Sequence, residues 1–208
     1  INKNYEHDQV VFLEKIMDKE NFSHFFDIGA NSGYYSFHLA LKFKDLKVKA
    51  FEPNIEAYKK FNKTLQKNSF KNVEVYNLGL SDNKRKVKMR SMIKNGFTQS
   101  NSAIIETSHA FDAKDFKIKF ANLDIGDDLL KYRNKKLSMK IDVEGHEINT
   151  LKGLKKTLKN NKCLLLIEIS EKNFNEINRL LKNLFYRCIF KSEYRSDYIY
   201  TNLNFNIN

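Results

Sequence analysis

Two short stretches have residue types and a spacing suited to binding a nucleoside. The first follows an apolar run and precedes a helical pattern, and it reads Asp27-Ile28-Gly29-Ala30-Asn31-Ser32-Gly33. The second is Glu52-Pro53, which begins 19 residues after Gly33 at the end of another apolar run. A glycine turn lets the backbone approach a ligand, and an acidic residue ending the next strand can accept hydrogen bonds from ribose hydroxyls. Together they predict a nucleoside-binding β-α-β unit.

The glycine spacing favours S-adenosylmethionine over a dinucleotide. Dinucleotide sites use G-x-G-x-x-G, whose close glycines and helix N-terminus hold a pyrophosphate. Here the pattern is Asp-x-Gly-x-x-x-Gly, and Asp27 suits a cationic sulfonium ligand better than a pyrophosphate, because like charges repel. A plain strand-to-helix turn capped by Asn31 or Ser32 is the alternative. Asn77 could contact adenine or ribose, or only form a turn ahead of Gly79. The predicted cofactor contacts are Asp27, Gly29, Asn31, Gly33, Glu52, Pro53, Asn77 and Asp142.

A further group of ionisable residues follows a later apolar run, between Lys140 and Glu147. Ligands of open α/β sheets bind outside the carboxyl ends of the strands, so this group should share an edge with Asp27 and Glu52. Methyl transfer from a sulfonium is an in-line displacement that needs an aligned acceptor and, for a hydroxyl, removal of a proton. The predicted catalytic residues are Asp142, Glu144 and His146.

Each catalytic candidate has its own expected role. Asp142 should face the methionine end of the cofactor or the acceptor, and Glu144 should bind acceptor hydroxyls. His146 is the preferred general base, because an unperturbed histidine titrates near neutral pH; a solvent-facing place at a helix start is the alternative. An extended chain would put all three on one side, whereas Gly145 could introduce a bend. Glu168 could complete a metal site with Asp142 and Glu144, but we predict no metal.

Length and composition indicate one folded domain over residues 1–208. Hydrophobic residues make up 41% of the chain and aromatic residues 13%, which is enough for a sizeable core. No stretch approaches the ~20 apolar residues of a membrane span. The N-terminus is polar, unlike a signal peptide, so we expect a cytoplasmic protein, and a start at Ile1 leaves room for a missing N-terminal piece. Cys163 and Cys188 lie in apolar runs and are expected to be buried thiols.

The chain carries a formal net charge of +12. A nucleic acid or another anionic partner would explain this charge. The lysines are dispersed, however, and no long basic run stands out, so we favour lysines spread over solvated faces. The expected partner is a small-molecule or glycan acceptor. An acidic or phosphorylated acceptor is left open, and nucleic acid is the less favoured choice.

Apolar and polar stretches alternate at the lengths of strands and helices. Strands are predicted at 24–28, 47–51, 73–78, 137–141 and 164–169, with a closing antiparallel pair at 185–190 and 197–201. Helices are predicted at 8–19, within an N-terminal segment 1–22, and at 34–43, 55–68, 148–159 and 174–184. The alternation predicts an α/β, Rossmann-like sheet of about seven strands with helices on both faces.

Residues 79–124 interrupt this alternation. Segments 87–90 and 116–123 alternate like edge strands, and segment 95–111 between them is rich in Asn, Ser and Thr. A long segment without clear periodicity is usually functional or mobile. We predict an inserted antiparallel hairpin carrying a substrate loop, in which the lone His109 is most simply interpreted as solvated.

In these stretches the chain resembles the FkbM family of S-adenosylmethionine-dependent methyltransferases. The matching motifs are Asp27–Gly33, Phe51-Glu52-Pro53, Leu80-Ser81-Asp82, Leu123-Asp124, Ile141–Glu147, Leu151-Lys152-Gly153 and Leu166-Ile167-Glu168. The resemblance implies a seven-stranded methyltransferase fold and cofactor contacts at the Asp27–Gly33 turn and Glu52. It also implies methylation of an oxygen, often a sugar hydroxyl of a glycan, antibiotic or other secondary metabolite. His146 occupies a slot that is often small in the family, and the middle segment shows no match that can be aligned.

Other functions compete with a glycan or small-molecule O-methyltransferase. Amino-group methylases of nucleic acids typically carry an Asp/Asn-Pro-Pro-aromatic element, which is absent because the only proline is Pro53. An RNA ribose 2′-O-methyltransferase is the main alternative, since Lys140, Asp142 and Glu168 could join a Lys-Asp-Lys-Glu type of site. The glycine spacing disfavours an NAD-dependent oxidoreductase. A non-catalytic binding module with the same fold is a further alternative.

Overall fold

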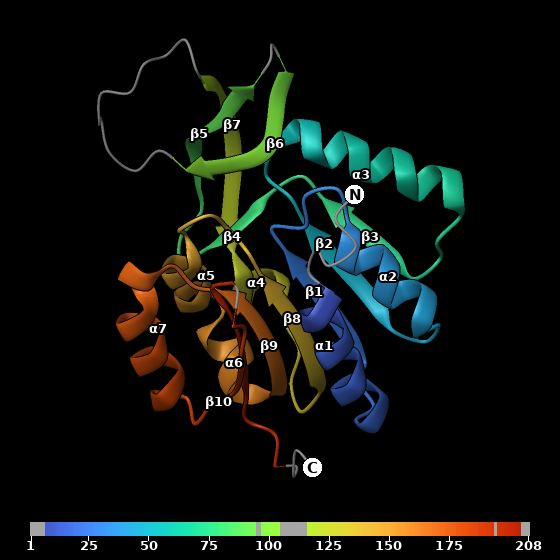
Figure 1. Cartoon of the computed structure of the whole chain (residues 1–208), viewed down its shortest axis with the longest axis vertical. Helices are drawn as coiled ribbons and strands as arrows, with labels where there is room; N and C mark the ends of the chain where they lie inside the picture. Colours follow the sequence, from blue (N-terminus) through green and yellow to red (C-terminus); the bar gives the residue numbers. More distant parts are fainter. Residues whose placement is uncertain (1–6, 95–96, 105–115, 194, 205–208) are drawn as a thin grey trace.

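The computed structural model describes residues 7–94, 97–104, 116–193 and 195–204, and a seven-stranded sheet lies at its centre (Figure 1). The strand order is β10-β11-β9-β8-β1-β2-β3. The strands are β1 (His24–Ile28), β2 (Lys47–Phe51), β3 (Val73–Tyr76), β8 (Lys136–Ile141), β9 (Lys162–Glu168), β10 (Arg187–Lys191) and β11 (Asp197–Thr201). β11 pairs antiparallel with β9 and β10, and the other neighbours are parallel. The predicted seven-stranded sheet with its antiparallel closing pair is confirmed.

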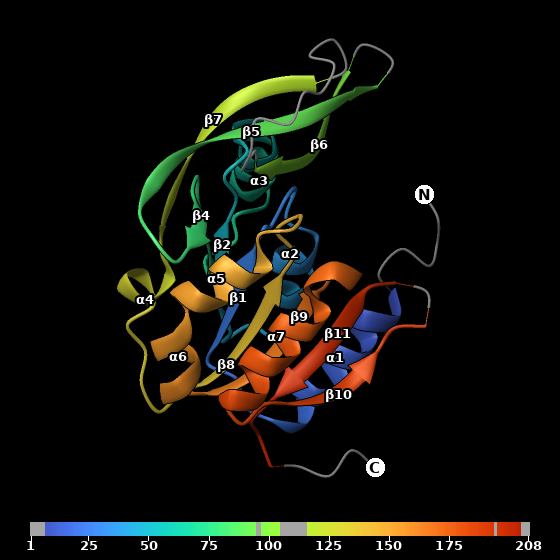
Figure 2. The same ribbon diagram turned by 90° about the vertical axis from the view of Figure 1, so that its left-hand side faces the viewer.

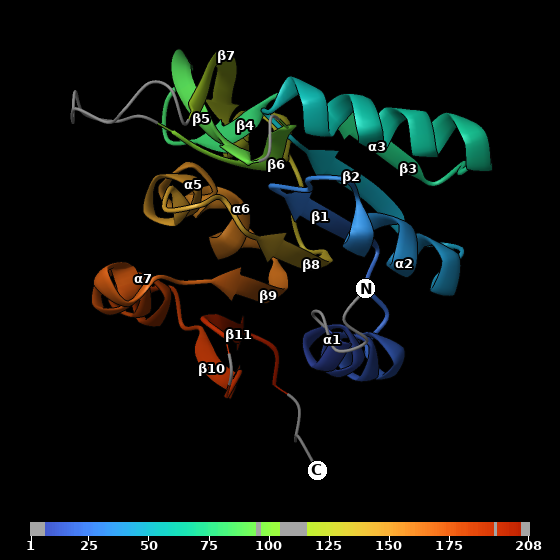
Figure 3. The ribbon, with the colours of Figure 1, turned by 45° about the horizontal axis from the view of Figure 1, so that its top comes forward.

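Helices cover both faces of this sheet, as predicted (Figure 3). One face carries α1 (His7–Lys19), α2 (Tyr34–Lys42) and α3 (Ile55–Asn68), and the other carries α4 (Gly126–Leu129), α5 (Glu147–Gly153), α6 (Lys155–Asn160) and α7 (Glu171–Asn183). Central strands buried on both faces need apolar side chains on both sides. All five residues of β1 are accordingly buried, and so is the run from Cys163 to Ile167 in β9.

The single helix predicted at 148–159 is instead two helices that meet at Leu154. The cause lies at Gly153, which ends α5. A Cβ atom on Gly153 would lie 1.8 Å from the carbonyl oxygen of Ser81. Only a glycine allows the two backbones to approach this closely, and glycine is a poor helix former. The approach fixes the segment that follows β3 against α5.

The inserted segment forms a second sheet of four strands, in the order β4-β7-β5-β6. Its strands are β4 (Gly79–Ser81), β5 (Arg85–Lys94), β6 (Phe97–Ile104) and β7 (Phe116–Ile125). The antiparallel pairing of β5 with β7 confirms the predicted hairpin. Figure 2 shows this sheet as a separate layer above the edge where β1 and β8 end.

Part of the predicted substrate loop is wrong, because residues 97–104 form β6. Ser102 bonds to the hydroxyl of Ser91 on β5 and accepts a hydrogen bond from the Asn54 side chain. Strands are usually predicted from an alternation of apolar and polar residues. In β6, polar side chains that bond to neighbouring residues take the place of the apolar ones, so this signal is missing. The remainder of the predicted loop, including His109, lies outside the described residues.

Two further expectations concern the cysteines and the membrane. Cys163 is buried, as predicted, whereas Cys188 is exposed, so its predicted burial is wrong. The cause is that β10 ends the sheet, and an edge strand is covered on fewer sides than a central one.

Within the described ranges, no helix is long and apolar enough to cross a membrane.

Candidate cofactor and active site

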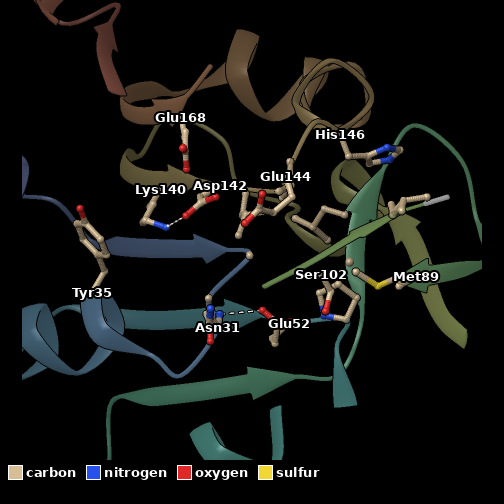
Figure 4. A pocket seen from close by; sticks show the side chains of 18 of the residues that line it. Asn31, Tyr35, Glu52, Met89, Ser102, Lys140, Asp142, Glu144, His146 and Glu168 are labelled. Atoms are coloured by element: carbon tan, nitrogen blue, oxygen red, sulfur yellow. Dashed lines mark hydrogen bonds and ion pairs between the residues drawn. The ribbon is translucent and has the colours of Figure 1, made fainter. Parts of the chain in front are cut away.

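A cavity of about 310 Å³ lies between the carboxyl ends of the central strands and the inserted sheet (Figure 4). Its lower wall comes from the ends of β1, β2, β8 and β9 and the turns that follow them. Its opposite wall comes from the inserted strands, through Met89, Ser102, Ile104 and Leu123. The cavity therefore lies where α/β sheets bind their ligands, and the insert closes it on one side.

The turn after β1 brings backbone directly to this cavity. Gly29 has a φ of +80°, and a Cβ atom there would lie 1.8 Å from the carbonyl oxygen of Asp142. The amides of Gly29 and Ala30 donate to the carbonyl of Phe51, at 2.9 and 3.1 Å. These bonds tie the end of β1 to the end of β2, and Asn31 lies at the cavity wall. The predicted glycine turn thus lies where a ligand could approach it.

Glu52 is the best-buried carboxylate that lines the cavity, with 6% of its surface exposed. One carboxylate oxygen accepts the backbone amide of Asn31 at 2.7 Å, and the other accepts that of Asn54 at 2.7 Å (Figure 4). Burial raises the pKa of Glu52 to about 7. Each carboxylate oxygen can accept more than one hydrogen bond. The fixed carboxylate can therefore still receive the two hydroxyls of a ribose.

Three of the predicted cofactor contacts do not line the cavity. Asp27 accepts hydrogen bonds from the amide and hydroxyl of Ser36, at 3.1 and 2.6 Å. A Cβ atom on Gly33 would meet the rings of Phe37 and Phe61 at 2.6 Å. The Asn77 amide donates to the carbonyls of Glu52 and Pro53. The geometry gives these three residues a positioning role, because they fix the helix and the two strand ends that carry the contacts.

One end of the cavity holds a chain of charged side chains (Figure 4). The Lys140 ammonium lies 2.8 Å from a carboxylate oxygen of Asp142 and 5.0 Å from the centre of the Tyr35 ring. Burial, followed by the charge of Asp142, raises the pKa of Glu168 to about 8. Burial alone would raise the pKa of Asp142, but Lys140 and a hydrogen bond from Glu168 lower it overall. At neutral pH, Asp142 is therefore an ionised acceptor between an ammonium and a protonated carboxyl.

Arg195 is a cavity residue that the sequence reasoning missed. It lies in the connection between β10 and β11 and forms a 2.9 Å ion pair with Asp197. Asp197 also accepts a hydrogen bond from Gln9 at 2.9 Å. No local motif marks Arg195. It reaches the site only because β11 inserts antiparallel beside β9 and brings the connection to the carboxyl edge.

Glu144 and His146 separate after β8 because the chain turns there. Glu144 has a φ of +51° and Gly145 a φ of +100°. The chain therefore bends at these two residues instead of continuing as an extended strand. Glu144 is exposed and lines the cavity. His146 is only 3% exposed, and its ring lies 3.0 Å from the hydroxyl of Ser81. Figure 4 shows the His146 ring directed away from Asp142, so the structure does not bring the predicted base to the charged end.

Residues 27–188 match the model of one known protein family, which is described as the Methyltransferase FkbM domain. The chain belongs to this family. No curated protein matches the chain.

Solved structures similar to this FkbM domain are methyltransferases. Precorrin-6y C5,15-methyltransferase from Geobacter metallireducens is 12% identical with a TM-score of 0.53, and the match covers 97% of this chain and 90% of that one. An rRNA methylase from Streptococcus thermophilus is 14% identical with a TM-score of 0.50, covering 97% and 96%. A Streptococcus mutans protein described as a methyltransferase, in complex with SAH, is 12% identical with a TM-score of 0.52, covering 92% and 95%. At these identities the likeness shows a shared fold.

S-adenosylmethionine is therefore the cofactor of this FkbM domain, as predicted. The cavity residues fit it. Glu52 can accept the ribose hydroxyls, and the charged end can receive the amino acid part of the cofactor. The opposite end has the apolar surface that a flat adenine needs, supplied by Pro53, Leu80, Met89, Ile104 and Leu123. Four of these five belong to the insert, which the sequence reasoning assigned to the acceptor alone.

The described residues offer no obvious metal site. Among them, no group of three or more His, Cys, Asp or Glu side chains is placed to hold a metal ion. Asp142, Glu144 and Glu168, considered as ligands from the sequence, do not form such a group. Asp142 instead bonds to the Lys140 ammonium and the Glu168 carboxyl.

Cofactor binding should depend on pH through Glu52. Ribose hydroxyls donate to an ionised carboxylate, and burial raises the pKa of Glu52 to about 7. Binding of S-adenosylhomocysteine should therefore strengthen as the pH rises between about 6 and 8, and then level off. Titrations of wild type and Glu52→Gln across this range test the expectation, since the amide variant lacks the ionisation. Equal slopes for both proteins would contradict it.

The position of His146 changes the expected effect of its removal. If His146 were a general base, its replacement would lower turnover more than it weakens cofactor binding. The ring instead bonds to Ser81, next to Leu80 at the apolar end of the cavity, where we expect the adenine to bind. We expect His146→Ala and Ser81→Ala to weaken S-adenosylhomocysteine binding by a similar factor, about tenfold, because each removes the same buried hydrogen bond. Turnover at saturating cofactor should change less. A loss of turnover with unchanged affinity would restore His146 as the base.

Proposed function

We propose that this FkbM domain transfers a methyl group from S-adenosylmethionine to a hydroxyl of a sugar, glycan or other polyhydroxylated metabolite. The observation that carries the proposal is the ionised carboxylate of Asp142, which lines the cavity between Lys140 and Glu168. A fixed carboxylate can align a hydroxyl and take its proton. The cofactor supplies an electrophilic methyl group on a sulfonium.

Asp142 would act on the acceptor as follows. Its carboxylate accepts a hydrogen bond from the acceptor hydroxyl and aims the oxygen at the methyl carbon. As the new carbon–oxygen bond forms, the carbon–sulfur bond breaks with its electrons on sulfur, and the hydroxyl proton passes to Asp142. Lys140 holds the carboxylate in place, and Glu168 donates a hydrogen bond to it. Tight positioning then supplies much of the rate.

The charge balance of the cavity supports a neutral acceptor. Its two long cationic side chains are already paired, Lys140 with Asp142 and Arg195 with Asp197. The exposed carboxylate of Glu144 also lines the cavity. Among the described residues that line the cavity, a phosphate would meet carboxylates and only those lysine and arginine side chains that are already paired with a carboxylate. Sugar hydroxyls, by contrast, donate readily to carboxylates.

An exposed aromatic ring beside the cavity supports a sugar. Tyr34 lines the cavity with 46% of its surface exposed. Its ring packs edge-on against Tyr35 at 5.5 Å and stacks on His38 at 6.2 Å between centroids. The supported ring offers a flat apolar surface with a hydroxyl at its end. A sugar ring could rest on this surface while one of its hydroxyls reaches Asp142.

An RNA ribose 2′-O-methyltransferase is the second candidate. The observation that favours it is that Lys140, Asp142 and Glu168 come together at one end of the cavity. From the sequence, these three residues could join a Lys-Asp-Lys-Glu type of site. Lys140 is already held by Asp142, and the carboxylates nearby disfavour a phosphate backbone, so we place this candidate second.

The test is methyl transfer from radiolabelled S-adenosylmethionine to two groups of acceptors, with Asp142→Asn as the inactive control. One group contains neutral mono- and oligosaccharides, and the other contains unmethylated RNA transcripts. We expect label in the saccharide group, on an ether oxygen by mass spectrometry. Label in RNA alone would replace the proposal by the second candidate, and label on nitrogen would overturn oxygen as the target.

A further inference from the structure

The inserted sheet has two different faces. Strand residues alternate between faces, and those that line the cavity, such as Met89 and Leu123, belong to the inner face. The opposite, outer face of β5 and β7 consists of four cross-strand pairs. These pairs, which define the outer face below, are Lys86 with Asn122, Lys88 with Phe120, Arg90 with Ile118 and Met92 with Phe116.

Large apolar side chains on the outer face are exposed to solvent. The exposed fraction is 53% for Met92, 45% for Ile118 and 60% for Phe120. Ile118 and Phe120 are two apart on β7, and Met92 lies opposite Phe116, two residues before Ile118. The three are therefore neighbours in one patch. Single exposed apolar residues are common, but a continuous patch of them indicates an interaction surface.

Cationic side chains are interleaved with this patch. The Lys86 ammonium lies 4.9 Å from the centre of the Phe120 ring, and the Arg90 guanidinium lies 5.3 Å from that of Phe116. Lys88 is exposed beside Phe120. The four pairs contain no Asp or Glu, and Asp124, the next β7 residue on this side, is held by the Lys84 ammonium at 3.2 Å. A partner of this face must therefore carry negative charge and also offer an apolar region that the exposed apolar side chains can contact.

One kind of partner matches both properties. A second copy of the chain would set like charges against one another. Single-stranded nucleic acid stacks its bases on aromatic rings, but Met92 and Ile118 offer no such ring. An anionic bilayer offers phosphate head groups to the lysines and arginine, and an acyl boundary to the apolar side chains. We propose that the outer face binds the protein peripherally to an anionic lipid surface.

Docking through this face would leave the cavity accessible. Residues of the inner face of this sheet line the cavity, whereas those of the outer face point to the opposite side of the sheet. No residue of the outer face lines the cavity. The proposal of membrane binding therefore does not rest on the proposed reaction, and each of the two can fail in its own test without affecting the other.

Co-sedimentation with vesicles tests this inference. The probes are vesicles of phosphatidylcholine alone and of phosphatidylcholine with phosphatidylglycerol in equal parts. We expect wild type to sediment only with the anionic vesicles. Ile118→Ser combined with Phe120→Ser, and separately Lys88→Glu, should each weaken this binding by about tenfold, because one removes apolar insertion and the other removes attraction to head groups.

Lys117→Glu is the matched control, since Lys117 is an exposed lysine on β7 that alternates to the inner side. We expect this control to change vesicle binding by less than about twofold, because it leaves the outer face intact. All variants should bind S-adenosylhomocysteine like wild type, which shows that they fold. Equal loss in Lys117→Glu, failure of wild type to bind anionic vesicles, or preferential binding of polyuridylate would each overturn the proposal.

Discussion

Replacing Glu52 by alanine is expected to weaken S-adenosylhomocysteine binding by roughly 100-fold or more, since hydrogen bonds to a charged group are worth about 1.5–3 kcal/mol each. Two ribose hydroxyls would lose their acceptor. The same change also leaves the amides of Asn31 and Asn54 without their carboxylate partner. Calorimetric titration of the variant measures the loss directly.

Glu56→Ala is the matched control for this experiment. Glu56 is also a carboxylate, four residues further along at the start of α3, but it pairs with Lys119 and lies away from the cavity lining. Its removal should change the affinity by less than about twofold. A Glu52→Ala protein that melts cooperatively and still binds like wild type would show that the ribose lies elsewhere.

Replacing Asp142 by asparagine should lower turnover by about 100-fold or more, which is the range of general acid–base contributions. Asparagine keeps the size of the side chain but cannot take the hydroxyl proton. It also leaves the Lys140 ammonium without its ion pair at 2.8 Å. Affinity for S-adenosylhomocysteine should fall by less than about tenfold, since the ribose and adenine contacts remain.

Asp128→Asn provides the comparison, because Asp128 is an exposed carboxylate on α4 outside the cavity lining. Initial rates with saturating cofactor separate an effect on turnover from one on binding. Wild-type turnover in Asp142→Asn would remove this residue from the reaction. A parallel fall in affinity and rate would assign Asp142 to the methionine end of the cofactor alone.

The sequence identified the site where local patterns suffice. The boundaries of β1, β2 and α3 coincide with those predicted, and Glu52 lines the cavity. This follows because parallel strands have their carboxyl ends at the same edge of the sheet. A residue just after one strand therefore lies near the residues that follow the neighbouring strands. Gly29 was found for a related reason, since its turn admits no side chain beside Asp142.

Side-chain direction was harder to predict than position. Asp27 and Asn77 lie at strand ends, yet both bond to the surrounding chain rather than lining the cavity. His146 lies after the correct strand, but the bend at Glu144 turns it toward Ser81. A sequence pattern fixes the edge at which a residue falls, whereas rotation about a few backbone bonds decides what it touches.

Residues brought in by distant pairing had no signal at all. Ser102 and Ile104 reach the cavity because β6 pairs with β5, and the polar composition of this strand hid it. Arg195 reaches the cavity because β11 runs antiparallel beside β9. Such contacts depend on the whole sheet rather than on neighbours in the chain.

Titration of S-adenosylhomocysteine and of NADH into the purified wild-type protein tests the central claim most directly. The claim is that the cavity at Glu52 and the glycine turn binds an adenosyl sulfonium cofactor and its product, and not a dinucleotide. We predict saturable, low-micromolar binding of S-adenosylhomocysteine, with release of heat, and none of NADH. Binding of NADH, or of neither compound, would contradict the account.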